Sequence, residues 1–188
     1  MNPVFTILAL NLGIFIAVQV SPDLLGNLGL YSDPDLFLER PWGIFSSMFV
    51  HDGFYHLFAN MITLYFFGSF FNRLVGNRIF LLVYFGGGIV GGIFFMLLAS
   101  NAIAVGASGA VFALGAAMAM IVPRMKVVIF PIPVPIPLWV AALGIFVLLT
   151  LLPIMSLYSG IAWQAHLGGA AFGLVAGYIL KKRKHFYV

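Results

Sequence analysis

Hydrophobic residues along this chain are gathered into long runs that leave little room for polar positions. Six runs predict transmembrane helices, near residues 3–20, 54–72, 79–99, 104–122, 138–153 and 161–180. A helix of about 20 apolar residues crosses the ~30 Å hydrocarbon core of a bilayer. We therefore expect an all-α polytopic membrane protein, with residues 1–188 as a single domain of six transmembrane helices.

Two segments between these runs have a different pattern. Residues 21–53 mix aromatic residues with acids, which predicts a structure at the membrane surface, and His51 and Asp52 are expected to be interfacial there. Pro123 ends the fourth run, and a proline stands at every second position from 131 to 137. This spacing forbids a regular helix and favours an extended path.

The composition supports the membrane interpretation. Hydrophobic residues make up 63% of the chain and charged residues 7%, against roughly 25% charged in ordinary globular proteins. The scattered basic residues form no nucleic-acid patch, so we expect the lipid bilayer as a partner and no nucleic acid. The first run has no basic leader and no cleavage signal, which favours a retained span.

The charges also predict how the chain is oriented. All five acids lie between the first and second runs, where Arg40 is the only base. The other bases follow the second, fourth and sixth runs: Arg73, Arg78, Arg124, Lys126, Lys181, Lys182, Arg183 and Lys184. Basic loops stay on the cytoplasmic side. We expect both termini in the cytoplasm, and the compact chain suits a prokaryotic plasma membrane.

Small residues repeat at four-residue spacing in two of the runs, as Gly109, Ala113 and Ala117 and as Gly169, Gly173 and Gly177. Such stripes let helix backbones approach closely in lipid. The fifth run has no such stripe, so we expect it to pack more loosely.

Polar residues inside the runs are the candidates for function, because such residues are costly in lipid. Ser108 precedes Arg124 by sixteen residues, and His166 precedes Lys181 by fifteen. Both then lie roughly 22–24 Å from the inner boundary. Asn60 falls at a similar depth, with His56 one turn above it. Four polar groups at one depth predict a single site.

These residue types suit acyl transfer. A serine becomes nucleophilic when a neutral histidine within hydrogen-bond reach accepts its proton. The runs contain no carboxylate, which favours a Ser-His dyad, although Phe112 is also placed to pack on the His166 ring. The chain has no cysteine and no His-Glu-x-x-His, so neither a Cys-ligated metal nor a zinc protease site is expected. Structural alternatives remain: a lone serine bonds to its own helix, and His56 and Asn60 serve as a helix cap or interhelical contact.

Three segments resemble the rhomboid intramembrane serine proteases: His56-Leu57-Phe58-Ala59-Asn60, Gly106-Ala107-Ser108-Gly109 and Ala165-His166-Leu167-Gly168-Gly169. The resemblance implies Ser108 as nucleophile, His166 as general base, and His56, Asn60 and the Ser108 amide as oxyanion stabilisers. It also implies cleavage of transmembrane protein substrates, with no metal and no cofactor. Trp42 is followed by Gly43 where many members have arginine, and Asn72 stands where a glutamate is frequent.

Two other functions are compatible with parts of the pattern. A rhomboid-like protein without proteolytic activity holds membrane clients, but such proteins generally lack the serine or the histidine. A small transporter has charged residues along its spans and internal repeats, and neither is evident here. A serine endopeptidase is the favoured prediction.

Overall fold

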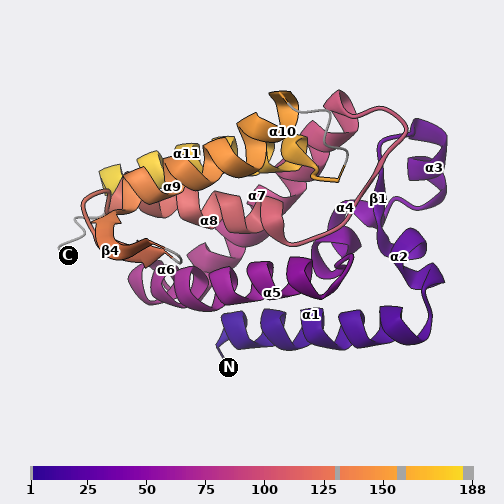
Figure 1. The fold of residues 1–188 in the computed structure, drawn as a ribbon, viewed down its shortest axis with the longest axis horizontal. Coiled ribbons are helices and arrows are strands. Elements are labelled where there is room, and N and C mark those ends of the chain that lie inside the picture. The colour runs from indigo at the N-terminus through magenta and orange to yellow at the C-terminus, as the bar shows by residue number, and fades with distance from the viewer. Residues whose placement is uncertain (1, 130–131, 156–159, 184–188) are drawn as a thin grey trace.

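The fold is mostly helical, with the long helices running along one common direction (Figure 1). The structure is a computed structural model that describes residues 2–129, 132–155 and 160–183. Each predicted run contains helix: α1 (Pro3–Val20), α5 (Phe54–Thr63) continued by the π-helix η2 (Leu64–Gly68) and by α6 (Ser69–Val75), α7 (Asn77–Leu98), α8 (Ser108–Ile121), α9 (Leu138–Phe146) continued by the π-helix η3 (Val147–Leu151) and by α10 (Leu152–Met155), and α11 (Trp163–Arg183).

By length and hydropathy, two helices of the described residues are able to cross a membrane, α1 and α7. The helix α8 and the segment Leu138–Leu151 are apolar but shorter. The mostly helical class is therefore confirmed, whereas the count of six spans stays a prediction.

The prediction was wrong at the start of the fourth run, because residues 104–107 are not helical. The strand β2 (Ile103–Ala104) pairs antiparallel with β1 (Leu30–Tyr31), and Gly106 has a φ of +118°, which glycine adopts readily. Helix α8 therefore begins only at Ser108. Its 14 residues rise about 21 Å, less than the hydrocarbon thickness.

Helix α8 lies at the centre of the bundle and packs closely against α11. A Cβ atom at Gly169 would overlap the Gly109 carbonyl oxygen, and one at Gly173 would overlap the Ala113 carbonyl oxygen. The two backbones thus touch along both stripes of small residues, which confirms their predicted close approach.

Residues 21–49 fold over one end of the bundle as α2 (Asp23–Leu28), β1, α3 (Pro34–Glu39), α4 (Gly43–Ser46) and the 3-10 helix η1 (Ser47–Phe49). The indole Nε1–H of Trp42 donates to the Asn27 carbonyl at 2.8 Å, and the Arg40 guanidinium lies 5.6 Å from the centre of the Tyr31 ring. A Cβ at Gly43 would lie 2.5 Å from the Gly29 carbonyl oxygen. A close backbone contact therefore explains why glycine follows tryptophan here.

Asn72 stands where a glutamate is frequent in the family, and its uncharged side chain makes a contact between two helices. Its Nδ2 donates to the Asn2 side-chain oxygen at 3.4 Å, and that oxygen also accepts from the Val4 amide at 3.0 Å, which caps α1. The contact connects the end of α6 to the start of α1.

The proline-rich segment is extended, as predicted. It forms one strand of a hairpin, which the spacing of its prolines did not predict. Strand β3 (Lys126–Ile129) pairs with β4 (Ile132–Pro137), with Val127 opposite Ile136 and Ile129 opposite Ile132. The Leu138 amide donates to the Met125 carbonyl at 2.8 Å, so the first turn of α9 is joined to the base of this hairpin.

The acids lie at one end of the molecule together with Arg40, which follows α3, and the other bases of the described residues lie at the opposite end. In Figure 1, α2 and α3 carry acids at one end, while α6 and the hairpin lie with their bases at the other. The start of α1 and the basic last turn of α11 are also at that end. Lys184 lies outside the described residues.

Candidate active site

Ser108 is the first residue of α8, and its hydroxyl oxygen lies 2.8 Å from His166 Nε2. The neighbouring Ala107 and Ala110 are fully buried, so this helix begins inside the protein. Amide groups in a first helical turn have no partner within the helix, and their dipoles favour negative charge. The serine oxygen therefore lies beside a base and at a helix end suited to an anion.

His166 lies in the first turns of α11, is 5% exposed, and has contacts on three sides. Its Nδ1 lies 2.9 Å from the Leu149 carbonyl oxygen. A carbonyl only accepts, so Nδ1 carries the proton and Nε2 is left to accept from the Ser108 hydroxyl. The Phe112 ring stacks on the imidazole at 4.4 Å and 20°, which confirms the predicted packing of Phe112.

The serine and histidine meet because the glycine stripes bring their helices together. Gly109 directly follows Ser108, and Gly169 lies one turn after His166. Their close backbone contact places two residues that are 58 positions apart within hydrogen-bond distance.

His56 lies against the loop that leads to Ser108. A Cβ at Gly106 would be 2.6 Å from His56 Nε2, so the ring fits only because this residue is a glycine. Asn60 is one turn further along α5, is 7% exposed, and donates from Nδ2 to the His56 carbonyl at 2.9 Å. The structure thus brings His56 to the serine loop, and the Asn60 amide bonds within its own helix, as neither a helix cap nor an interhelical contact.

The prediction that His51 is interfacial was wrong, because its side chain is fully buried. Its Nε2 accepts from the Ala107 amide at 3.4 Å, and its ring meets the His56 ring edge-on at 4.9 Å. Burial, with a smaller effect from nearby His56, lowers the pKa of His51 to about 3, so the ring is neutral. His51 supports both the serine loop and His56, and its sequence position beside Asp52 gave no sign of this.

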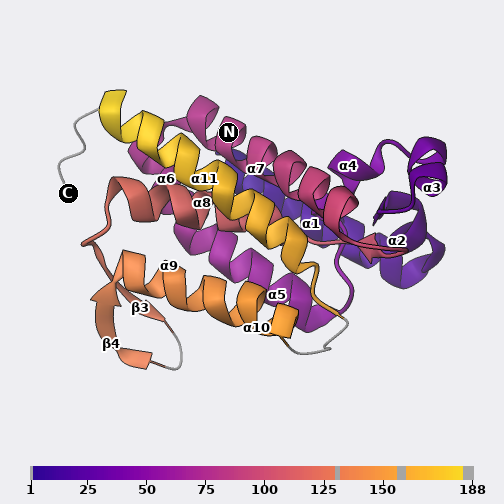
Figure 2. The same cartoon turned by 90° about the horizontal axis from the view of Figure 1, so that it is seen from above.

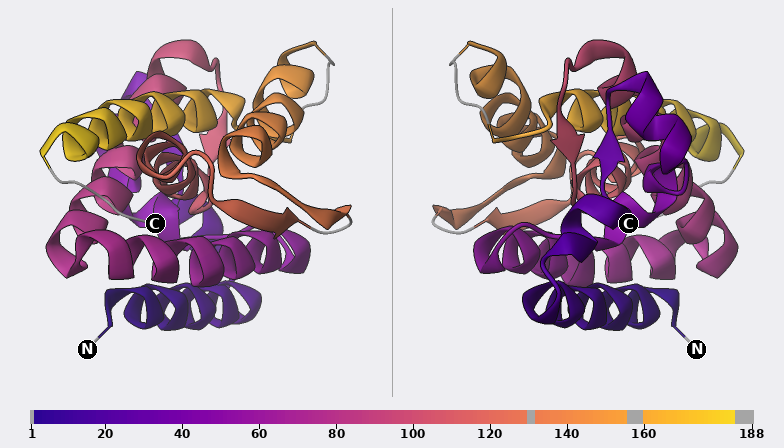
Figure 3. Two further views of the ribbon diagram at one scale, coloured as in Figure 1. Left: turned by 90° about the vertical axis from the view of Figure 1, so that its left-hand side faces the viewer. Right: turned by 90° about the vertical axis from the view of Figure 1, so that its right-hand side faces the viewer.

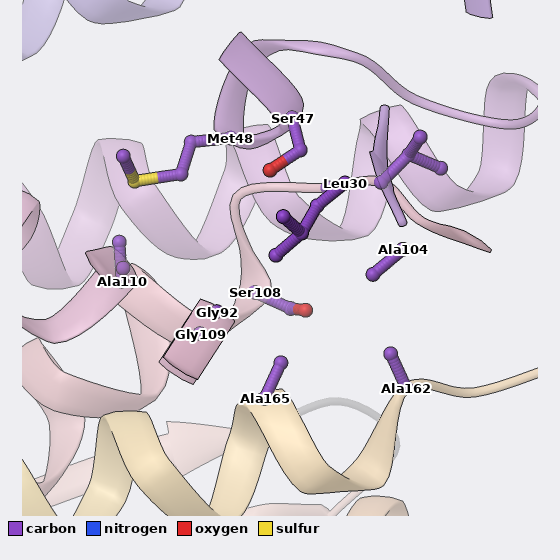
Figure 4. Close-up of a pocket in the computed structure, with 13 residues that line it drawn as sticks. Leu30, Ser47, Met48, Gly92, Ala104, Ser108, Gly109, Ala110, Ala162 and Ala165 are labelled. Atoms are coloured by element: carbon purple, nitrogen blue, oxygen red, sulfur yellow. The ribbon is translucent and has the colours of Figure 1, made fainter. Parts of the chain in front are cut away.

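A small cavity lies next to Ser108 (Figure 4). Its volume is about 20 Å³, which is close to the space of one water molecule. The Ser108 hydroxyl points into it. Most of the other lining residues are small, among them Ser47, Ala104, Ala162 and Ala165, and Leu30 also lines it.

The Leu149 carbonyl, like His51, is a part of this site that the sequence did not predict. A backbone carbonyl has no residue type of its own, so no motif marks it. Among the described residues, no three His, Asp or Glu side chains are grouped as a metal ion would require.

Comparison with known proteins identifies a family for this chain. The Rhomboid domain family model matches residues 38–183. The mitochondrial Rhomboid protein 1 of Saccharomyces cerevisiae is 30% identical over 192 residues, 96% of this chain and 54% of that protein. The putative rhomboid protease YdcA of Bacillus subtilis is 38% identical over 74 residues, 39% of this chain and 37% of that protein.

A relative described as inactive also matches. Inactive RHOMBOID-like protein 8 of Arabidopsis thaliana is 34% identical over 77 residues, 41% of this chain and 22% of that protein. The chain spans about half the length of the yeast relative and less of the other two. Since the family model covers well over half of the chain, this protein belongs to the membrane-embedded rhomboid family.

Proposed function

We propose that this chain is an intramembrane serine endopeptidase that cleaves peptide bonds in or near transmembrane segments of other proteins. The observation that carries the proposal is the 2.8 Å contact between Ser108 Oγ and His166 Nε2, with the His166 Nδ1 proton held on a carbonyl. In this tautomer Nε2 is free to accept the serine proton.

The proposed reaction has two stages. In the first, Ser108 Oγ attacks the substrate carbonyl carbon as its proton passes to His166 Nε2, and His166 then returns that proton to the leaving amine. The acyl-enzyme is hydrolysed in the second stage, when His166 takes a proton from water and gives it back to the serine oxygen. No metal and no cofactor takes part.

Negative charge develops on the substrate oxygen in both stages. We assign its stabilisation to the Ser108 amide, His56 and Asn60. The amide belongs to a helix N-terminus, and His56 lies against Gly106, two residues before the nucleophile. The Asn60 side chain has a second N–H besides the one that it donates to His56.

The size of the cavity at Ser108 supports a restriction on substrates. A space of about 20 Å³ accommodates a methyl group or a water but no branched side chain. We propose that a small side chain of the substrate enters it, next to the bond that is cleaved.

The separation of charges supports an orientation in the membrane. With the basic end in the cytoplasm, both described chain ends lie inside and the Ser108 site lies toward the outer face. A prokaryotic plasma membrane remains the location that we propose. The yeast relative is described as mitochondrial and the Bacillus relative is bacterial, so these similarities fit either compartment.

A fluorophosphonate probe tests the proposal, because it forms a covalent bond with an activated serine. We expect labelling of the purified protein, and its loss in Ser108→Ala and His166→Ala. Ser69→Ala is the matched control, since Ser69 lies in α6 and does not line the Ser108 cavity, and it should keep its labelling. Absence of labelling in the natural chain, or labelling that survives Ser108→Ala, would contradict the proposal and favour a rhomboid protein without proteolytic activity.

A further inference from the structure

The contact between His166 Nδ1 and the Leu149 carbonyl, at 2.9 Å, joins the catalytic histidine to a different helical segment. Leu149 lies in η3, the π-helical continuation of α9. In serine proteases with a triad, a buried aspartate accepts the same proton and fixes the tautomer of the histidine. This chain has no carboxylate in its predicted spans, and the carbonyl occupies the equivalent position on the ring.

The sequence explains why this carbonyl is available. In an α-helix, the Leu149 carbonyl would accept from the amide of the fourth residue along the chain, which is Pro153. Proline has no N–H, so that hydrogen bond cannot form. The turn from 147 to 151 widens into a π-helix, a form that often occurs at functional sites.

The helix that carries Leu149 also contacts the His166 ring indirectly, through Phe112. Phe146, the last residue of α9, meets the Phe112 ring edge-on at 6.3 Å and 73°. Phe112 in turn stacks on His166. The position of α9 and η3 therefore affects both the hydrogen bond at Nδ1 and the aromatic packing on the face of the His166 ring.

Helix α9 is loosely packed, as the absence of a small-residue stripe predicted. Leu138 and Ala141 are its two buried residues, and the helix stands to one side of α8 (Figures 2 and 3). An apolar cavity of about 480 Å³ separates it from Thr63 and Phe67 of the second run. A displacement of α9 would therefore meet little resistance from that side and would carry the Leu149 carbonyl with it.

We propose that the Leu149 carbonyl is a positioning group that holds His166 in the tautomer with Nδ1 protonated, and that Pro153 keeps this carbonyl free to do so. Catalysis is then coupled to the position of α9, because the acceptor moves with that helix. This inference rests on the proposed function for its effect on rate, but the state of the ring is measurable without any activity.

The test is Pro153→Ala, which supplies the missing N–H and lets the Leu149 carbonyl bond within its own helix. Its matched control has lactic acid at position 153, which has the alanine side chain on an ester linkage without an N–H. Nitrogen-15 NMR of the histidine rings, with His166 assigned by comparison with His166→Ala, reports which nitrogen carries the proton. The rate of fluorophosphonate labelling reports the reactivity of Ser108.

We expect protonated Nδ1 in the natural chain and in the ester control, and a mixture of tautomers in Pro153→Ala. The labelling rate should fall about tenfold in Pro153→Ala alone, which corresponds to the loss of one hydrogen bond. Protonated Nδ1 retained in Pro153→Ala, or an equal loss in the ester control, would overturn the inference. If the natural chain is not labelled at all, the proposed function fails, while the NMR result still decides the state of His166.

Discussion

The contact between Gly109 and Gly169 determines how close the serine and the histidine can come, and Gly169→Ala tests its importance. The added Cβ would overlap the Gly109 carbonyl oxygen, whereas ordinary Cβ contacts begin at 3.4 Å. Both atoms belong to helix backbones and cannot rotate away, so α8 and α11 must separate by about 1 Å.

A separation of that size between the two helices breaks the hydrogen bond between Ser108 and His166. The distance from Ser108 Oγ to His166 Nε2 is 2.8 Å, and hydrogen bonds of this kind extend to about 3.2 Å. A misplacement of about 1 Å costs about 100-fold in rate, and overpacking a core costs about 1–3 kcal/mol in stability. We therefore expect a folded protein with a lower melting temperature, in which fluorophosphonate labels Ser108 about 100-fold more slowly.

Gly115→Ala is the matched control on the same central helix. No atom lies within 4 Å of a Cβ at Gly115, so this change should leave the labelling rate unaltered and stabilise the helix by about 0.5–1 kcal/mol. Labelling of Gly169→Ala within threefold of the natural rate, or an equal loss of labelling rate in Gly115→Ala, would refute this prediction. Thermal unfolding in detergent separates a lost contact from a lost fold.

Three further predictions concern the surroundings of the serine. Gly106→Ala places a side chain on a residue with a φ of +118° and against His56. Thermal unfolding should therefore show a loss of about 1–3 kcal/mol in stability, together with slower fluorophosphonate labelling. Unchanged stability would contradict this prediction. The unfolded chain protonates His51 near pH 6.5, whereas burial holds the folded pKa at about 3, so stability should fall as pH drops from 6.5 toward 3. That part of the pH dependence should disappear in His51→Phe, and an identical profile would refute it. Substrates with alanine before the cleaved bond should be cut at least about tenfold faster than those with phenylalanine, as measured by mass spectrometry of the products, and equal rates would exclude the small cavity as a determinant.

Much of the fold follows from sequence because lipid allows few solutions. Long apolar runs must be helical, since unpaired backbone groups are costly in hydrocarbon, and the run at 3–20 coincides with α1. The four-residue spacing of glycines likewise indicated which helices touch. The start of α8 was missed because Ile103 and Ala104 are as apolar as a helix requires, and their pairing with Leu30 and Tyr31 is a long-range contact that no local pattern reveals.

The supporting residues of the site were harder to predict than the serine and the histidine. Ser108 and His166 are conspicuous because polar groups are rare in these runs. His51 resembled a surface residue because it follows the interfacial segment and precedes an acid, and only the fold places the Ala107 amide beside it. Its burial is thus a property of the assembled loops and not of the residues around it in sequence.

The lipid environment also explains why a backbone carbonyl suits this site better than a carboxylate as the group that orients the His166 ring. An aspartate within a span costs up to about 2.5–3.5 kcal/mol on insertion scales, the most at the centre of the membrane, and an ionised one without a full set of partners costs more. A backbone carbonyl is neutral and already present, so it needs only to be released from its own helix. One proline four residues later achieves this at Leu149, because it removes a single donor and adds no charge. Thr150→Asp tests this explanation, because it places a carboxylate beside Leu149 at a fully buried position. We expect this change to destabilise the protein and not to raise the rate of fluorophosphonate labelling. Faster labelling would refute this explanation of why the site has no acid.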